Sequence, residues 1–250
     1  FKNYLLRNGI VYTEAFFAPS AFIKKGFKYE DMVRNFEKNL KKIKKETGIT
    51  VKLIGDVSRT FGLENAEKNL EMFKANPFDG FIGIGLGGAE SKGPSKDFGP
   101  VFNAALKSGY HVVAHAGEDC GPESIWDALK ICHAERIGHG ITAVQDENLM
   151  KYLRDKNIAL EVCPTSNVFT KKYVKSMAEH PVKTFFEKKV FPCAPSKKLY
   201  TFSSVSSPRR TSLSPRPPPP ASSPCSTREA YPCRLSSQSP ISCRRNHTER

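Results

Sequence analysis

Long hydrophobic runs are missing from this 250-residue sequence, which nowhere contains 18 consecutive apolar residues and has a mean hydropathy of −0.44. A helix that crosses a membrane needs about 20 predominantly apolar residues, so the sequence predicts no membrane span. A secretory signal is missing as well, because the chain begins at Phe1 without a basic segment that leads into an apolar one. We therefore expect no membrane partner.

Paired cysteines are also missing. The seven cysteines are odd in number and irregularly spaced, and no two of them form a Cys-x-x-Cys pair. Small disulfide-stabilised proteins normally show an even number of cysteines at regular spacings, so this pattern argues against a disulfide framework. Reduced cysteines are typical of intracellular proteins, and the sequence therefore predicts a cytoplasmic location.

Glycine is absent after residue 190, although 17 glycines precede that position. The last 60 residues hold 11 of the 18 prolines, many serines, and 10 Lys and Arg against 2 Asp and Glu. Such a segment buries too little apolar surface to offset its loss of conformational entropy on ordering. The sequence thus predicts a globular domain over 1–190 and a disordered Pro/Ser/Arg-rich tail over 191–250. Because the composition changes abruptly, we interpret the tail as a product of aberrant translation.

Net charge favours an acidic partner at first sight, because the whole chain carries +14. Most of that excess belongs to the tail, since 1–190 holds 29 basic and 23 acidic residues. The tail has few aromatic side chains on which bases could stack, so its charge predicts only unspecific, salt-sensitive contact with nucleic acid. A non-catalytic protein that binds nucleic acid through this tail remains one interpretation of the sequence.

Two hydrophobic periods alternate along 1–190. Short β-branched or aromatic runs lie at 10–17, 51–57, 80–86, 110–115, 136–139 and 158–163. Helical spacing occurs at 29–46, 65–75, 98–108, 123–133, 145–155 and 172–188. Several of the runs are apolar on both faces, which is typical of a parallel sheet covered by helices. About six βα units without a dinucleotide-binding fingerprint predict an α/β fold that is a partial (β/α)8 TIM barrel.

Polar side chains stand where two adjacent strands end. His115 ends the fourth strand, Glu118 follows it, and His139 ends the fifth. Because chemistry in a barrel occurs at the carboxyl ends of the strands, we expect these three residues to face one cavity. Three other histidines have structural interpretations. We expect His111 and His133 to be hydrogen-bonded core residues and His180 to lie at the surface.

The motifs around these residues resemble the adenosine deaminase family of zinc-dependent purine deaminases. The resemblance rests first on His-Ala-Gly-Glu at 115–118 and Arg-Ile-Gly-His-Gly at 136–140. The segments 12–19, 83–90 and 161–167 resemble the second, fourth and seventh strands of that family's barrel. The similarity covers roughly residues 4–190, with the motifs in the family's order.

The resemblance implies a role for four residues. His115 would be the zinc ligand from the fifth strand, and Glu118 would be the carboxylic acid that protonates a purine ring nitrogen. His139 would orient the attacking hydroxide, and Gly88 would offer its backbone N–H to the purine. The implied reaction is hydrolysis of a carbon–nitrogen bond that converts adenosine to inosine and ammonia. Adenine or another purine or nucleotide stays open as the substrate, although Gly138 favours adenosine over adenine.

Other parts of the family pattern are missing from the sequence. The family binds one Zn²⁺ through a His-x-His pair on strand one, a histidine on strand five and an aspartate on strand eight. No His-x-His occurs here, and the Pro/Ser tail begins where the eighth strand and its Asp-Asp pair are expected. Three of the four protein ligands are therefore absent. The resemblance implies an incomplete barrel that lacks the first and eighth strands and, as written, has no appreciable deaminase activity.

Overall fold

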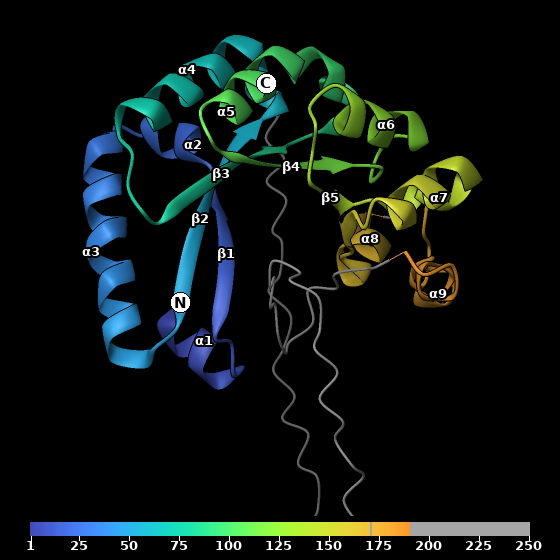
Figure 1. Cartoon of the computed structure of the whole chain (residues 1–250), viewed down its shortest axis with the longest axis horizontal. Coiled ribbons are helices and arrows are strands. Elements are labelled where there is room, and N and C mark those ends of the chain that lie inside the picture. Colours follow the sequence, from blue (N-terminus) through green and yellow to red (C-terminus); the bar gives the residue numbers. More distant parts are fainter. Residues whose placement is uncertain (171, 191–250) are drawn as a thin grey trace, which may run out of the picture. The chain divides into compact units, whose positions relative to one another are not determined.

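The computed structural model describes residues 1–170 and 172–190, and these form a curled parallel sheet with helices on its outer side (Figure 1). Within them, the strands pair in their sequence order, each parallel to the next. The strands are β1 Tyr12–Phe17, β2 Thr50–Ser58, β3 Phe81–Gly87, β4 His111–Ala116, β5 Arg136–His139 and β6 Ala159–Glu161. This arrangement confirms the predicted partial (β/α) barrel.

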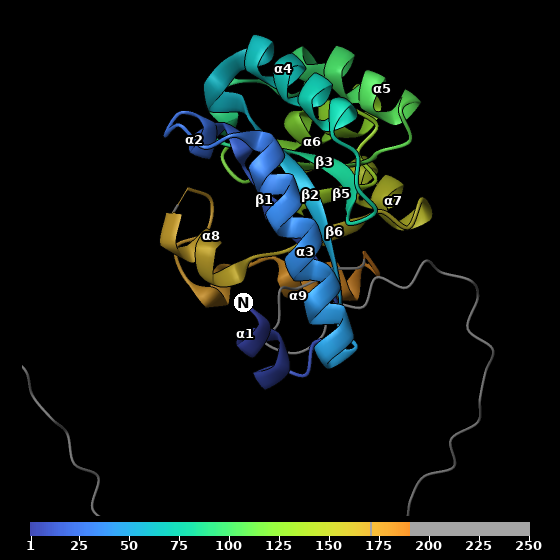
Figure 2. The ribbon, with the colours of Figure 1, turned by 90° about the vertical axis from the view of Figure 1, so that its left-hand side faces the viewer.

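The helices of the described residues are α1 Lys2–Arg7, α2 Pro19–Ile23, α3 Tyr29–Thr47, α4 Gly62–Ala75, α5 Gly99–Lys107, α6 Pro122–Lys130, α7 Glu147–Asp155, α8 Pro164–Thr170 and α9 Val182–Glu187. The helices α2 to α7 connect consecutive strands, whereas α1 precedes β1, and α8 and α9 follow β6. Figure 2 shows α3 lying across β1 and β2. Short 3-10 turns follow several strands, among them η1 Arg59–Phe61 after β2 and η2 Glu90–Lys92 soon after β3. In the described part of the chain, no helix combines the length and the apolar character that crossing a membrane requires.

Helix ends follow the local sequence signals. Gly48 ends α3 with φ +74°, and Asn157, shortly after α7, has φ +54°. Both lie in the left-handed region, where glycine and asparagine are the favoured residues. At the start of α7, the Asp146 side chain accepts hydrogen bonds from the N–H groups of Asn148 and Leu149. This cap satisfies two N–H groups of the first turn and fixes where α7 begins.

The core lies between the sheet and its helices. Phe73 of α4, Phe102 of α5 and Phe185 of α9 are completely buried. Phe17 at the end of β1 continues this layer, with ring-centroid distances of 4.8 Å to Phe36 of α3 and 6.3 Å to Phe81 of β3. Large apolar rings that bridge helices and strands account for much of the burial energy of such a layer.

The last predicted helix differs from the structure. Instead of one helix over 172–188, a 3-10 turn at Met177–Glu179 precedes the short helix α9. Pro181 explains the break, because proline has no N–H to donate and is suited only to the first turn of a helix. The predicted disordered tail and the predicted boundary at residue 190 concern 191–250, which lie outside the described residues.

A buried ion-pair network on the concave side joins the first and last described strands. Arg136, the first residue of β5, places its Nη2 2.8 Å from Glu14 Oε2 of β1 and its Nε 2.8 Å from Glu161 Oε1 of β6. The three side chains are only 12–21% exposed. Tyr12 donates a further hydrogen bond to Glu14 Oε1. Three charged side chains thus link β1 to β5 and β6, two neighbouring strands with which β1 does not pair.

Candidate functional site

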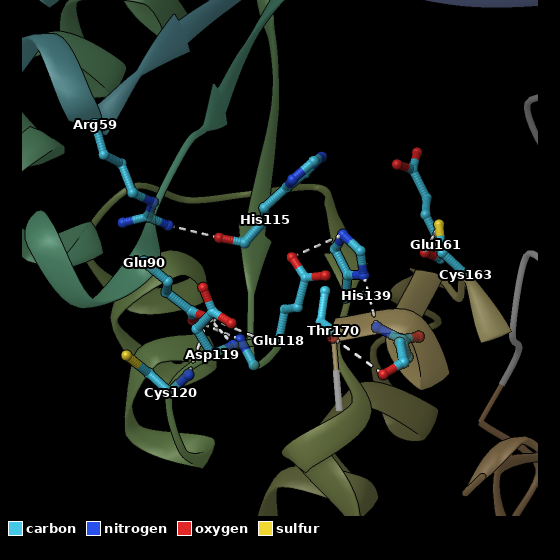
Figure 3. Close-up of polar contacts among 12 residues, drawn as sticks. Arg59, Glu90, His115, Glu118, Asp119, Cys120, His139, Glu161, Cys163 and Thr170 are labelled. Carbon is cyan, nitrogen blue, oxygen red and sulfur yellow. Dashed lines mark hydrogen bonds and ion pairs between the residues drawn. The ribbon is translucent and has the colours of Figure 1, made fainter. Parts of the chain in front are cut away.

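The predicted site residues His115, Glu118 and His139 meet at the carboxyl ends of β4 and β5. One ligand atom from each side chain lies within 4.8 Å of the others. Figure 3 shows Glu118 and His139 pointing toward each other, with His115 beside them. Glu118 Oε2 is 3.2 Å from His139 Nε2, and the two imidazole rings are 5.1 Å apart in an edge-to-face arrangement. Gly88 lies just beyond the end of β3, the neighbour of β4.

The backbone conformation of His139, and not the strand register, brings the two histidines together. His115 pairs with Gly138, and Ala116 pairs with His139, so an extended backbone would place the two imidazoles on opposite faces. His139 instead has φ +64°, a conformation that residues other than glycine rarely adopt. Gly138 leaves room for the His115 ring, because a Cβ there would lie 2.4 Å from His115 Cδ2. This local strain brings two imidazoles to one point, as is common at functional sites.

A chain of hydrogen bonds holds the His139 ring at its Nδ1 atom. The Val182 N–H donates to His180 Nδ1 (3.1 Å), which leaves His180 Nε2 to donate to Asn167 Oδ1 (3.2 Å). Asn167 Nδ2 then donates to His139 Nδ1 (2.9 Å). A neutral His139 accordingly carries its proton on Nε2, which faces Glu118. This chain ties helices α8 and α9 to the site.

Burial sets the protonation states of the cluster. Removal from water raises the pKa of Glu118 to about 7, and the negative charges of Asp119 and Glu90 add to the rise. Burial lowers the pKa of His139 to about 4, assisted by the neighbouring His115, and burial likewise lowers the pKa of His115. At neutral pH both imidazoles are therefore uncharged, and a substantial share of Glu118 holds a proton. A protonated carboxyl beside neutral imidazoles can act as a general acid.

The raised pKa of Glu118 makes stability depend on pH. The folded chain holds this proton more tightly than the unfolded chain, whose carboxyl has its ordinary pKa of 4.5, so ionisation opposes folding as pH rises from 4.5 through 7. We expect Glu118→Gln to stabilise the metal-free chain by about 1–2 kcal/mol more at pH 8 than at pH 4.5. This value is smaller than the free energy that corresponds to the full pKa shift of Glu118, because solvent screens the partly exposed carboxyl. Urea unfolding at the two pH values measures this difference.

The matched control for this measurement is Glu123→Gln, which removes an exposed carboxyl from the first turn of α6, close to Glu118 in the sequence. The depressed pKa of His139 acts in the opposite sense, because it costs stability as pH falls from 6.5 toward 4. His139 is present in the parent and in both variants, so its contribution cancels in the comparison. An equal pH-dependent gain in the control would contradict the assignment to Glu118.

The donor chemistry of the cluster suits a divalent metal ion such as zinc. Neutral imidazole nitrogen and carboxylate oxygen are common zinc ligands, and the cluster offers two of the first and one of the second. His115 fits a ligand role best, because burial keeps its imidazole neutral, whereas the bond from Asn167 leaves the proton of His139 on Nε2, the nitrogen that faces the cluster. A catalytic zinc site uses three protein ligands, and the sequence contains no His-x-His pair that could add two more.

Three of the remaining histidines lie where the sequence did not place them. His111, expected in the core, is 60% exposed at the start of β4 and forms an ion pair with Glu135 (2.9 Å), while His133 is exposed with φ +55°. His180, expected at the surface, is buried and takes part in the chain described above. The two core predictions failed because His111 begins β4 and His133 lies in the loop between α6 and β5, where side chains reach solvent.

Sequence reasoning also missed Asn167, Arg59 and Glu90, all of which are buried next to the site. Each makes contacts with residues far away in the sequence, so no local spacing indicated them. The available signal was chemical: each is a polar or charged residue within a few positions after the end of a strand. Figure 3 shows Arg59 and Glu90 directed at the segment that carries His115 and Glu118.

Comparison with known proteins identifies relatives across the described domain. The family model for adenosine deaminase matches residues 2–194. The chain is 37% identical over 183 residues to an aminodeoxyfutalosine deaminase of Streptomyces avermitilis, covering 72% of this chain and 51% of that protein. It is 39% identical over 182 residues to an adenosine deaminase of Escherichia coli O1:K1, covering 72% and 54%. The chain thus spans about half the length of the curated relatives it matches.

A solved structure shows the same similarity in three dimensions. The adenine deaminase from Arthrobacter aurescens superposes with a TM-score of 0.73 at 29% sequence identity, covering 78% of this chain and 60% of that one.

Proposed function

The chain belongs to the adenosine deaminase family, and on that premise we propose that the protein of which it forms part hydrolyses adenosine to inosine and ammonia. The observation that supports this most directly is the convergence of His115, Glu118 and His139 in states suited to the reaction. Hydrolysis of an aromatic amine requires an acid that protonates the ring and a group that directs water at the adjacent carbon. The cluster offers one residue for each task.

Glu118 is the proposed acid. Its carboxyl keeps a proton near neutral pH because burial raises its pKa to about 7. Transfer of that proton to a ring nitrogen of the purine makes the neighbouring carbon more electrophilic. His139, whose Nε2 lies 3.2 Å from Glu118 Oε2, has its Nδ1 engaged by Asn167, so only Nε2 faces the reacting groups. His139 can therefore orient the attacking water and hold charge as the bond forms.

Zinc is the proposed cofactor, with His115 as one ligand and the other ligands supplied by residues that the 250-residue sequence does not contain. When bound, zinc would supply hydroxide at neutral pH by lowering the pKa of water. The proposed substrate contact is the backbone N–H of Gly88, directed at the purine edge, as in the resemblance described above. Gly88 follows a strand next to the one that carries His115.

The substrate class is a purine that carries an amino group, and adenosine is the member we propose. The relatives act on different substrates by name: adenosine, aminodeoxyfutalosine and adenine. Adenine or another purine or nucleotide is accordingly the second candidate. The proposed nucleic-acid contact of the basic tail concerns residues outside the described ranges and stays a prediction.

We expect the 250-residue polypeptide by itself to convert no adenosine at a rate above about 1 s⁻¹, the low end of ordinary enzyme turnover. The reason is that His115 alone binds zinc too weakly to hold it. Incubation of the purified polypeptide with Zn²⁺ and adenosine, followed by measurement of inosine, tests this. Turnover above that rate would show that the chain itself holds a working metal site.

A hybrid protein tests the site separately from the missing ligands. Residues 2–190 replace the matching segment of the Escherichia coli adenosine deaminase, whose remaining segments bring their own strands and ligands. We expect this hybrid to bind zinc and to form inosine. Adenine, AMP and aminodeoxyfutalosine, assayed in parallel, identify the preferred substrate. A folded, zinc-loaded hybrid that deaminates none of these purines would contradict the proposed function.

A further inference from the structure

Glu90 accepts hydrogen bonds from four consecutive backbone N–H groups. It begins the turn η2, is 4% exposed, and receives the N–H of Gly117 (2.6 Å), Glu118 (3.0 Å), Asp119 (2.7 Å) and Cys120 (3.1 Å). The Ser124 hydroxyl donates to the same carboxylate from α6. Such charge-assisted hydrogen bonds are about twice as strong as neutral ones. One carboxylate thus organises the whole segment between β4 and α6.

Arg59 holds the other side of the same segment. It begins the turn η1 and is 2% exposed. Its guanidinium donates to the backbone carbonyl of His115 (2.5 Å), to the carbonyl of Gly93 (2.5 Å) and to the Ser95 hydroxyl (3.1 Å). Burial lowers the pKa of Arg59, and the negative charge of Glu90 opposes that shift. The two opposite charges therefore support each other in a place where a lone charge would be costly.

We propose that Arg59 and Glu90 are a positioning pair that sets the places of His115 and Glu118. Arg59 fixes the carbonyl at 115, and Glu90 fixes the N–H groups from 117 onward, so the backbone that carries both site residues is held from two sides (Figure 3). Neither side chain is proposed to touch substrate. The consequence for deamination rests on the proposed function, whereas the consequence for the backbone does not.

The backbone between the residues held by Arg59 and Glu90 turns sharply at Gly117. Gly117 has φ +73°, and a Cβ there would lie 2.5 Å from Ile125 Cδ1 and 2.6 Å from Thr142 Oγ1. The resulting sharp turn directs four N–H groups to one point, an arrangement that needs a negative charge to be stable. Without Glu90 these buried and half-buried donors have no comparable acceptor, and the turn would open. Glu118 would then lose the distance of 3.2 Å that brings it to His139.

Amide hydrogen exchange of the full 250-residue chain, without metal, tests the backbone part of the proposal. In Glu90→Gln the side-chain amide presents N–H groups where acceptors are needed, so we expect exchange at 117–120 to accelerate about ten- to a hundredfold. The amides of β2 should keep their rates. Glu90→Asp retains the charge on a shorter side chain and should restore part of the protection. The matched control is Glu123→Gln, because Glu123 accepts a single N–H, that of Gly121 at 3.1 Å.

The hybrid enzyme tests the functional part. We expect Glu90→Gln to lower kcat about a hundredfold, as a small misplacement of a reacting group does, and to change KM less than about threefold. Arg59→Lys, which keeps the charge and loses the planar fork, should lower kcat less. If the unsubstituted hybrid is inactive, the proposed function fails while the exchange data still decide the positioning role. Exchange at 117–120 that matches the Glu123→Gln control, or that accelerates equally throughout the chain, would overturn the proposal.

Discussion

Glu118→Gln in the hybrid lowers kcat for adenosine by about 10²–10⁴-fold, the contribution usual for general acid–base catalysis. Glutamine keeps the size of the side chain and removes the proton that the raised pKa of Glu118 makes available near pH 7. The amide can still accept from His139 Nε2, so the local packing changes little. Steady-state kinetics at pH 6.5 to 7 measure the loss, and zinc content and circular dichroism confirm that the protein is otherwise intact.

The control for this experiment is again Glu123→Gln, whose carboxyl lies five residues further along the chain, in α6. We expect its kcat to equal that of the hybrid. A Glu118→Gln protein that retains more than a tenth of the parent kcat would contradict the role of Glu118 as the acid. The site would then need another proton donor, and the convergence of the three side chains would lose its proposed meaning.

Arg136→Met lowers the free energy of unfolding of the 250-residue chain by about 3–5 kcal/mol, the cost of breaking a buried ion pair from one side. Methionine fills much of the volume of the arginine stem, so the loss comes mainly from charge. Without the guanidinium, Glu14 and Glu161 remain on the concave side of the sheet without the cation that pairs with both of them. Urea unfolding at pH 7 measures the change.

Lys68→Met is the matched control, because Lys68 forms an exposed pair with Glu64 on the surface of α4. Pairs of this kind contribute about 0.3–0.5 kcal/mol. Equal losses in the two variants would show that the network of Arg136 contributes no more than a surface pair.

The sequence predicted the strands, and it predicted that His115, Glu118 and His139 lie at one edge of the sheet, because both features depend on local pattern. Apolar runs separated by helical spacing give parallel strands, and the carboxyl ends of parallel strands lie at one edge of a sheet. Gly48 and Asn157 likewise marked helix ends through their own backbone preferences. These features need only neighbouring residues to be recognised.

Other features depend on contacts between distant residues and were not predictable in this way. The burial of His180 follows from its bonds to Asn167 and Val182, since in sequence it stands in a polar stretch before a proline. Glu90 looks like one more polar residue after a strand until the four N–H groups that face it are known. The left-handed backbone of His139, which turns its ring toward His115, is equally invisible in residue spacing. Tertiary structure decides each of these.

The main-chain N–H of Val182 determines where the proton of His139 resides. Through His180 and Asn167, that amide imposes one tautomer on an imidazole in a different strand, with no charged group in between. A shift of α9 that withdrew this amide would free His180 to invert its own tautomer, and the inversion would pass along the chain. The tautomer of His139, and with it the proton that faces Glu118, thus depends on the first turn of α9.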